Sequence, residues 1–255
     1  MTSVVRELHI QSRPGSSAAT ASLPQGFVGD RNAQPSYDAE LADKFIDDYT
    51  SSRSTQSVAK RGLDIIAAAS MFFLLLPGLL AIAIAIKLTS PGPVLFRQER
   101  YGLYNRRFVI FKFRTMYIDQ CDESGVKQTC EGDERVTKVG KLLRRFNLDE
   151  LPQLLNVVRG EMSIVGPRPH VPGMLAGGVL YEMLVPDYFH RHRVKPGLTG
   201  LAQARGFRGS TVDSEAAKAR IDHDLQYIRD WSFALDLRLI VETAWSEIFS
   251  AGKGI

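Results

Sequence analysis

Two adjacent carboxylates stand out in the stretch NLDELPQLLNVVRGEMSIVGPRP, because Asp149 and Glu150 fall where a helix is expected to begin. Asn147 or Asp149 can cap that helix, Pro152 is tolerated in its first turn, and Gly160 is typical of its end. The positive end of a helix favours the ionised form of an acidic side chain. An ionised carboxylate can act as a nucleophile, a metal ligand or a base, but the spacing alone also fits a simple helix cap.

Basic residues surround this pair along the chain. Arg144 precedes Asp149 by five residues, and Arg168 lies in GPRP between two prolines that stiffen the backbone. The segment RHRVKPGLTGLAQARGFRG adds further cations: Arg191, Arg193, Lys195, Arg205 and Arg208. Guanidinium groups bind phosphate in a bidentate manner, and carboxylates with a divalent cation complete a phosphoryl-transfer site. The chain has no GxxxxGK, GxGxxG, GxSxG or HExxH motif, so the standard nucleotide, hydrolase and zinc interpretations have no support.

Two predicted elements precede the acidic pair and are expected to help position it. Residues 135–146, RVTKVGKLLRRF, combine helical apolar spacing with five basic residues, which is typical of a helix on an anionic membrane or of a basic face over a protein core. The runs VLFRQERYG and RFVIFKFRTM predict a β-hairpin. Its interleaved basic residues are Arg97, Arg100, Arg106, Arg107, Lys112 and Arg114. These residues also fit a nucleic-acid surface, but the apolar segment upstream makes lipid phosphate the nearer anion.

That upstream segment, residues 65–86, has 22 residues without a charge. A continuous helix of this size would extend about 33 Å, enough to cross the hydrocarbon core of a bilayer. Pro77, which is followed by Gly78, predicts a bend near the middle. Basic residues flank both ends, which favours a cytoplasmic location for both under the positive-inside rule. The segment is therefore either a re-entrant helix or an ordinary kinked span.

The rest of the chain carries weaker signals. The 255 residues are 44% hydrophobic, enough to bury a real core. Residues 1–57 hold 5 basic and 7 acidic side chains and no secretory signal, so they predict a flexible, partly acidic tail, and the basic excess lies in the folded part. That excess favours anionic partners. Cys121 and Cys130 lack a second pair for a zinc site and are interpreted as reduced.

Two histidines and two tryptophans near the end of the chain allow more than one interpretation. His190 and His192, in FHRHR, are isolated from other types of metal ligand and are expected to be structural or to face phosphate. Trp231 and Trp245 lie among aliphatic residues in the segment 222–249. This pattern suits the boundary between water and lipid, and it suits core packing equally well.

Five ordered motifs resemble the bacterial sugar transferase family, the monotopic polyprenyl-phosphate phosphoglycosyl transferases. They are KRGLDIIAAASMFFLLLPGLL, FKFRTM, LRRFNLDELPQLLNVVRGEMSIVGPRP, VKPGLTGLAQARGFRG and DLQYIRDWSFALDLRLIVET, within residues 60–254. The resemblance implies an α/β fold, mainly helical with a small sheet or hairpin. It also implies a re-entrant membrane helix (58–90) bent at Pro77, between the tail (1–57) and a catalytic domain (91–255). That domain would lie on the cytoplasmic face of the bacterial inner membrane, with amphipathic helices at the interface.

The same resemblance implies a reaction. The family transfers a sugar 1-phosphate from a UDP-sugar to polyprenyl (undecaprenyl) phosphate with Mg²⁺, releases UMP, and thereby initiates exopolysaccharide or other surface glycan synthesis. The family's acidic dyad falls on Asp149 and Glu150. Asp149 would attack the β-phosphorus, form an aspartyl phosphosugar and contact Mg²⁺, while Glu150 would act as a base toward the lipid phosphate or through the metal. Arg144, Arg168 and Arg208 would bind phosphate.

Three motifs differ from the family's usual pattern. Leu76-Pro77 replaces Ser-Pro at the helix break, so no serine hydroxyl can satisfy the freed carbonyl there. GLAQ replaces GWAQ at residues 200–203, which removes an aromatic residue from a possible interface position, and GEMS replaces GDMS at Glu161.

The rival hypothesis is a non-enzymatic scaffold tethered to the membrane, with a basic cytoplasmic face that holds partners. Membrane lipids are expected partners and nucleic acid is not. Homo-oligomerisation is compatible with the sequence, and the sequence does not specify which sugar is transferred.

Overall fold

The computed structural model describes residues 57–120, 132–207 and 213–249. Within these ranges helices dominate, and the strands form three two-stranded sheets. The expected class, mainly helical α/β with small sheets, is therefore confirmed. The division of the chain into a tail (1–57), a membrane helix (58–90) and a catalytic domain (91–255) stays a prediction.

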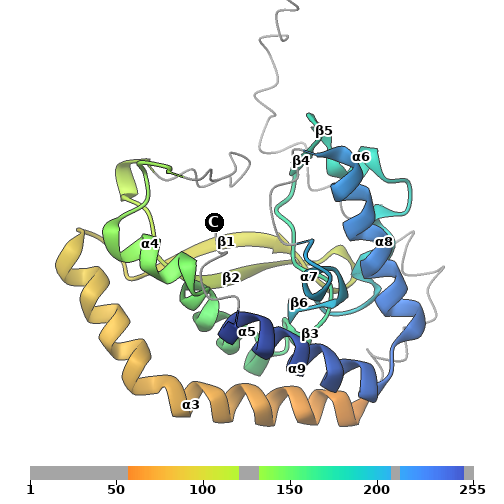
Figure 1. Ribbon diagram of the computed structural model, residues 1–255, viewed down its shortest axis with the longest axis horizontal. Helices are drawn as coiled ribbons and strands as arrows, with labels where there is room; N and C mark the ends of the chain where they lie inside the picture. Colours follow the sequence, from red (N-terminus) through yellow and green to blue (C-terminus); the bar gives the residue numbers. More distant parts are fainter. Residues whose placement is uncertain (1–56, 121–131, 208–212, 250–255) are drawn as a thin grey trace, which may run out of the picture.

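The apolar segment forms one long helix, α3 (Val58–Thr89), with Pro77 inside it. Ser57 caps its start, because the Ser57 hydroxyl accepts a hydrogen bond from the Lys60 backbone N–H at 3.1 Å. In the part of the chain that the structure describes, α3 alone is long and apolar enough to cross a membrane, with a mean hydropathy of 2.5 in its most apolar window. Figure 1 shows that α3 bends and runs along one side of the rest of the fold.

One stripe of α3 packs against the protein while the remainder is open. In its first half, Ala68 is fully buried in a cluster with Leu154 and Val157. In its second half, Leu79 and Ile86 belong to a cluster that includes residues of β2 and α4. Other large apolar side chains of α3 are exposed: Ile66, Phe73, Leu74, Leu80, Ile84 and Leu88. Both halves of the helix therefore contact the same body, and the opposite face offers an apolar surface.

A buried ion pair attaches the start of α3 to the last helix, α9 (Phe233–Phe249). The Lys60 ammonium lies 2.7 Å from an Asp236 carboxylate oxygen and donates to the Val165 carbonyl at 3.2 Å. Asp236 also accepts hydrogen bonds from the Tyr227 hydroxyl at 2.8 Å and from the Trp231 indole at 3.1 Å. Asp236 thus joins α3 to α9 and to the end of α8 (Ser214–Asp230).

The predicted hairpin is confirmed: β1 (Leu95–Tyr101) pairs antiparallel with β2 (Arg107–Phe113). Asn156, which is fully buried in α5 (Leu154–Arg159), fastens β2 to that helix. Its side-chain oxygen accepts from the Phe111 N–H at 3.1 Å, and its amide donates to the Val109 carbonyl at 2.7 Å. The same amide donates to Glu161 at 2.7 Å, so the longer side chain in GEMS takes part in this contact.

The helix expected from Asn147 to Gly160 is divided into two parts. A 3-10 helix, η3 (Leu148–Gln153), contains the acidic pair and Pro152, and α5 follows it and ends at Gly160, whose φ of 90° closes the helix as expected. Asn147 does not act as a side-chain cap. It adopts a left-handed conformation with φ 52°, which Asn tolerates, and this conformation turns the chain between α4 (Lys138–Arg145) and η3.

The second half of the fold contains the GPRP segment. β3 (Ser163–Val165) pairs parallel with β6 (Gly197–Thr199). The two strands approach so closely that a Cβ on Gly197 would lie 2.1 Å from the Gly166 nitrogen, so this position requires glycine. The remaining short elements are β4 (Leu175–Ala176), β5 (Val179–Leu180), α6 (Tyr181–Leu184), η4 (Tyr188–Arg193) and α7 (Leu201–Ala204). Two further 3-10 turns, η1 (Leu103–Asn105) and η2 (Ile118–Gln120), border the hairpin.

The predicted interface residues have different environments. Trp231 is partly buried against α9 through its bond to Asp236, whereas Trp245 is 64% exposed. Leu201, in the position of the family's usual tryptophan, is buried in a core cluster with Val165 and Tyr227. In α4, Leu143 is buried while Leu142 is exposed. Only part of each predicted amphipathic segment is therefore open to a membrane.

We predict that Asp236→Asn lowers the free energy of unfolding by about 3–5 kcal/mol, because it leaves the buried Lys60 ammonium without its counter-ion. Thermal unfolding of the detergent-solubilised protein measures this loss. Arg238→Ala is the matched control, since its pair with Glu242 on the same helix is exposed and should contribute about 0.5 kcal/mol or less. Equal effects of the two changes would contradict the anchoring role of Asp236.

Candidate active site

The acidic pair lies together at the start of η3, as the sequence predicts, and both side chains are shielded. Asp149 is only 9% exposed. The Glu150 side chain is 18% exposed. Local sequence produces this arrangement, because the left-handed Asn147 turns the chain out of α4 and Pro152 is accommodated within the 3-10 turn. The two carboxylates are therefore held in a rigid, partly desolvated position.

Glu150 is the centre of the site's ion pairs. One of its oxygens lies 2.7 Å from the Lys112 ammonium and 2.5 Å from a nitrogen of Arg168. The other oxygen accepts from the second terminal nitrogen of Arg168 at 3.1 Å, so Arg168 binds the carboxylate in a bidentate manner. Glu150 thus brings together a strand of the hairpin, the 3-10 helix and the GPRP segment.

The two carboxylates differ in their electrostatics. Burial would raise the pKa of Glu150, but Arg168 and Lys112 outweigh it and hold that pKa well below its usual range. For Asp149, burial dominates and raises the pKa, while Lys112 and Arg144 oppose the rise and Glu150 adds to it. The prediction that a helix start favours the ionised form of Asp149 stays a prediction, and burial acts against it. The ionised form of the Asp149 carboxylate therefore depends on nearby cations.

The predicted phosphate-binding arginines have different positions. Arg168 is in the site, bound to Glu150. Arg144, at the end of α4, lies near enough to Asp149 to lower its pKa, and its Nε donates to the Thr115 hydroxyl at 2.8 Å. Arg208 lies outside the described residues, as do Cys121 and Cys130.

Two cations of the hairpin, Lys112 and Arg100, were not expected in the site. Lys112 forms an ion pair with Glu150, and Glu150 acts electrostatically on Arg100. The two cations share one face of the hairpin. Lys112 pairs with Phe96, and Arg100 lies on the same face as Phe96 because every second residue of β1 points the same way. This alternation of basic residues was visible in the sequence. The contact to Glu150 was not, because it joins residues 38 positions apart.

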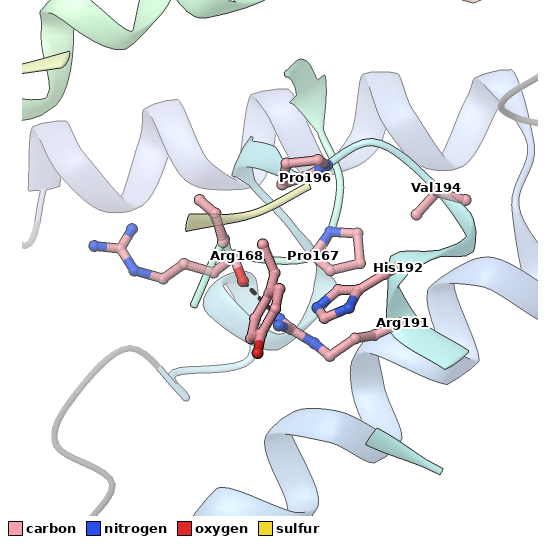
Figure 2. A pocket seen from close by; sticks show the side chains of 8 residues that line it. Pro167, Arg168, Arg191, His192, Val194 and Pro196 are labelled. Carbon is pink, nitrogen blue, oxygen red and sulfur yellow. Dashed lines mark hydrogen bonds between the residues drawn. The ribbon is translucent and has the colours of Figure 1, made fainter. Parts of the chain in front are cut away.

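The GPRP segment is held from both sides. On one side, the Gly197 N–H donates to the Pro167 carbonyl at 2.9 Å. On the other, Arg191 donates to the Arg168 carbonyl at 2.6 Å. Figure 2 shows that the Arg168 backbone faces Arg191 while its side chain extends away from this small pocket. The residues that line this pocket hold the backbone of the GPRP segment, and the Arg168 side chain extends away from them to Glu150.

Arg191 is itself fixed by a buried ion pair. Its Nε and one terminal nitrogen bind the same oxygen of Asp224, in α8, at 2.9 and 2.7 Å. The two side chains are 0% and 2% exposed. Because neither charge can reach water, loss of either partner would leave an uncompensated buried charge. It connects α8 to the backbone of the residue that binds Glu150.

The two histidines of FHRHR differ in their environments. His192 is buried, contacts Asn105, and packs against the Tyr101 and Tyr188 rings. Burial, followed by the neighbouring Arg191, holds the pKa of His192 well below its usual range, so the ring is neutral. His192 is thus structural, which is one of the two roles expected for it. His190 is more exposed and lies 4.0 Å from Asp187.

The donor set around Asp149 fits a magnesium ion that is shared with a substrate. Within residues 57–120, 132–207 and 213–249, no three His, Cys, Asp or Glu side chains cluster as a metal-binding group. Both oxygens of Glu150 already accept from cations, whereas no described side chain donates a hydrogen bond to Asp149. Mg²⁺ is commonly held by one or two carboxylates with substrate phosphates and waters. Asp149 could therefore hold Mg²⁺ only together with such ligands.

Comparison with known proteins gives consistent matches. The profile of the family described as "Bacterial sugar transferase" matches residues 55–250. The exopolysaccharide production protein PSS of Rhizobium leguminosarum bv. phaseoli is 53% identical over 197 residues, which cover 77% of this chain and 98% of that protein.

Two longer relatives match over part of their length. The undecaprenyl-phosphate glucose phosphotransferase of Komagataeibacter xylinus is 50% identical over 191 residues, 75% of this chain and 36% of that protein. The UDP-glucose:undecaprenyl-phosphate glucose-1-phosphate transferase of Escherichia coli (strain K12) is 47% identical over 186 residues, 73% of this chain and 39% of that protein. The chain thus spans well under half the length of these two relatives.

We predict that Asp224→Asn destabilises the protein by about 3–5 kcal/mol, because the buried Arg191 guanidinium loses its counter-ion. Chemical unfolding in detergent measures the change. The matched control is Glu215→Gln in the same helix, whose pair with Lys218 is exposed and should contribute about 0.5 kcal/mol or less. A loss as small as that of the control would contradict the role of the pair.

Proposed function

Because the chain belongs to the bacterial sugar transferase family, we propose that it transfers a sugar 1-phosphate from a UDP-sugar to polyprenyl (undecaprenyl) phosphate. The observation that carries this proposal is the shielded Asp149 carboxylate beside Glu150, Lys112 and Arg168. A carboxylate without a hydrogen-bonding partner among the described side chains, placed among cations, suits attack on a phosphorus atom. The expected product initiates an exopolysaccharide or another surface glycan.

The charge of the site matches a diphosphate. Arg100, Lys112, Arg144 and Arg168 act electrostatically on the dyad, so the cations outnumber the two carboxylates. A nucleotide sugar brings a dianionic diphosphate, which would compensate this excess. Positive groups that are fixed before the substrate arrives also stabilise the charge that spreads over the phosphoryl oxygens in the transition state.

In the first step, an Asp149 oxygen attacks the β-phosphorus of the UDP-sugar. A bond forms between this oxygen and the phosphorus, the bond from the β-phosphorus to the bridging oxygen breaks, and UMP leaves with that oxygen and the electron pair. The covalent product is an aspartyl phosphosugar. Arg168 and Lys112 lie close enough to the dyad to bind the phosphoryl oxygens during this step, and Arg144 supports the ionised form of Asp149.

In the second step, an oxygen of polyprenyl phosphate attacks the same phosphorus and Asp149 leaves. A polyprenyl diphosphate sugar is formed and the carboxylate is regenerated. The low pKa of Glu150, which results from Arg168 and Lys112, makes it a weak base in the ligand-free protein. Its proposed contribution is therefore to hold these two cations, and it becomes a better base only when a substrate phosphate takes them over.

Mg²⁺ is the proposed cofactor. When bound between Asp149 and the diphosphate, it would neutralise phosphate charge and orient the phosphorus for attack.

The catalytic part is proposed to lie on the cytoplasmic face of the inner membrane, with α3 re-entrant. Both halves of α3 pack against the same body, which a helix that crossed the bilayer could not do without drawing charged elements into lipid. Near α3, the exposed Leu237, Val241 and Trp245 of α9 follow one another at intervals of four residues and provide a second apolar surface. Membrane lipids thereby cover both surfaces.

Glucose is the first candidate for the transferred sugar, because two of the relatives carry glucose in their names. We predict that purified protein in detergent, given polyprenyl phosphate and Mg²⁺, releases UMP faster from UDP-glucose than from UDP-galactose or UDP-N-acetylgalactosamine. Asp149→Asn should abolish both UMP release and covalent labelling by sugar phosphate, because an amide is a poor nucleophile. Membrane association should be unchanged.

Two outcomes would contradict this assignment. Normal turnover by Asp149→Asn would exclude Asp149 as the nucleophile. A wild-type protein without UMP release from any donor, but with intact membrane association, would favour the scaffold. The matched control is Asp187→Asn, an exposed carboxylate in the same domain, which should retain wild-type turnover.

We further predict that cysteines at both ends of α3 react from the cytoplasmic side only. Val58→Cys and Leu88→Cys suit this test, because the wild-type residues are 85% and 81% exposed. Each is introduced after Cys121→Ser and Cys130→Ser, and labelled with a membrane-impermeant thiol reagent in oriented vesicles. Labelling of the two positions from opposite sides would establish a transmembrane span.

A further inference from the structure

Arg100 differs from the other cations at the site. It lies next to the end of β1, on the hairpin face that also carries Lys112. Lys112 and Arg168 are each paired with Glu150, and Arg191 is paired with Asp224. Among the residues that the structure describes, no carboxylate forms an ion pair with Arg100.

All the hydrogen-bond acceptors of Arg100 are neutral. One terminal nitrogen donates to the Gln98 side-chain oxygen, and the other donates to the Pro169 carbonyl over a long 3.4 Å. Its Nε is buried and has no hydrogen-bond partner. A guanidinium that is shielded from water without an anion is energetically unfavourable, so this arrangement is better suited to a protein that has an anionic ligand in place.

The electrostatics agree with the contacts. Burial and then the neighbouring Arg168 lower the pKa of Arg100 to about 10, and Glu150 only partly opposes them. The Arg100 side chain reaches from the hairpin face that carries Lys112 to the Pro169 carbonyl, while the Arg168 side chain reaches Glu150 from the GPRP segment. Because Pro169 follows Arg168 directly, a phosphate group bound by the Arg168 guanidinium would supply the negative charge that Arg100 lacks.

We propose that Arg100 is a phosphate-binding residue, which completes the phosphate site together with Arg168 and Lys112. The ligand chemistry is a phosphate oxygen of a substrate, from either the diphosphate of the nucleotide sugar or the phosphate of the polyprenyl acceptor. Assignment to a substrate rests on the proposed function; binding of a phosphate anion does not.

The first test uses Arg100→Gln and Arg100→Lys in the full chain, with Arg97→Gln as the matched control. Arg97 is in the same strand on the opposite, exposed face and stacks near Phe111. Inorganic pyrophosphate with Mg²⁺ is the probe, and its dissociation constant is measured by calorimetry. Arg100→Gln should weaken binding about 10- to 100-fold, because a charge-assisted hydrogen bond is lost. Arg100→Lys should recover part of this loss, since it keeps the charge but not the fork of donors, and Arg97→Gln should bind normally.

Thermal unfolding separates a binding role from a structural one. Without pyrophosphate, Arg100→Gln should unfold at the wild-type temperature or above it, because the change removes a partly buried charge that has no carboxylate partner among the described residues. With pyrophosphate, its stabilisation should be smaller than that of the wild type. Unchanged pyrophosphate affinity, or a large loss of stability in the absence of ligand, would overturn the proposal.

Steady-state kinetics then distinguish the source of the phosphate. A KM that rises for the UDP-sugar assigns Arg100 to the donor diphosphate, and a KM that rises only for polyprenyl phosphate assigns it to the acceptor. If neither KM rises, Arg100 does not bind a substrate. If the wild type has no transferase activity, the proposed function fails, while the pyrophosphate measurement still decides whether Arg100 binds a phosphate anion.

Discussion

The geometry of the site depends on one buried carboxylate that accepts hydrogen bonds from two cations. Glu150 binds Lys112 from the hairpin and Arg168 from the GPRP segment, and it compensates the charge of both partly buried cations. These contacts determine where η3 lies relative to both neighbours. Since Asp149 is adjacent in the chain, its carboxylate is carried into the same group of cations. Glu150 thus pairs with the two cations, whereas Asp149 accepts no hydrogen bond from a described side chain.

A second set of polar contacts joins the long apolar helix α3 to this arrangement. Arg61 donates to the carbonyls of Val157 and Val158 at 2.7 and 2.9 Å, and thereby satisfies groups at the end of α5 that the helix itself cannot pair. Asp64 accepts from the Ile164 N–H at 3.0 Å, in the strand that leads to GPRP. With the Lys60 ion pair, these contacts make α3 part of the fold. The two carboxylates are therefore connected through α5 and β3 to the long apolar helix.

Local signals in the sequence predicted several elements correctly. The hairpin followed from two runs of aromatic and β-branched residues, the end of α5 from Gly160, and the long helix from an uncharged segment. The burial of individual side chains was not specified by these local signals. A helix start favours the ionised form of Asp149, but the burial that raises its pKa is not visible in the local sequence. The two tryptophans of the segment 222–249 differ, because Trp231 reaches the buried Asp236 and Trp245 is exposed.

The sequence by itself determined which chemical groups are present and in what order: the acidic dyad at a helix start, the arginine between two prolines, and an apolar helix with a proline in it. Only the tertiary structure decided which charges are paired. The bond from Lys112 to Glu150 spans 38 residues and that from Arg191 to Asp224 spans 33, so no local pattern specifies them. The physical reason is that the cost of burying a charge depends on all its neighbours in space. It is this pairing that separates Arg100, which lacks a carboxylate partner within the described chain, from arginines that look the same in the sequence.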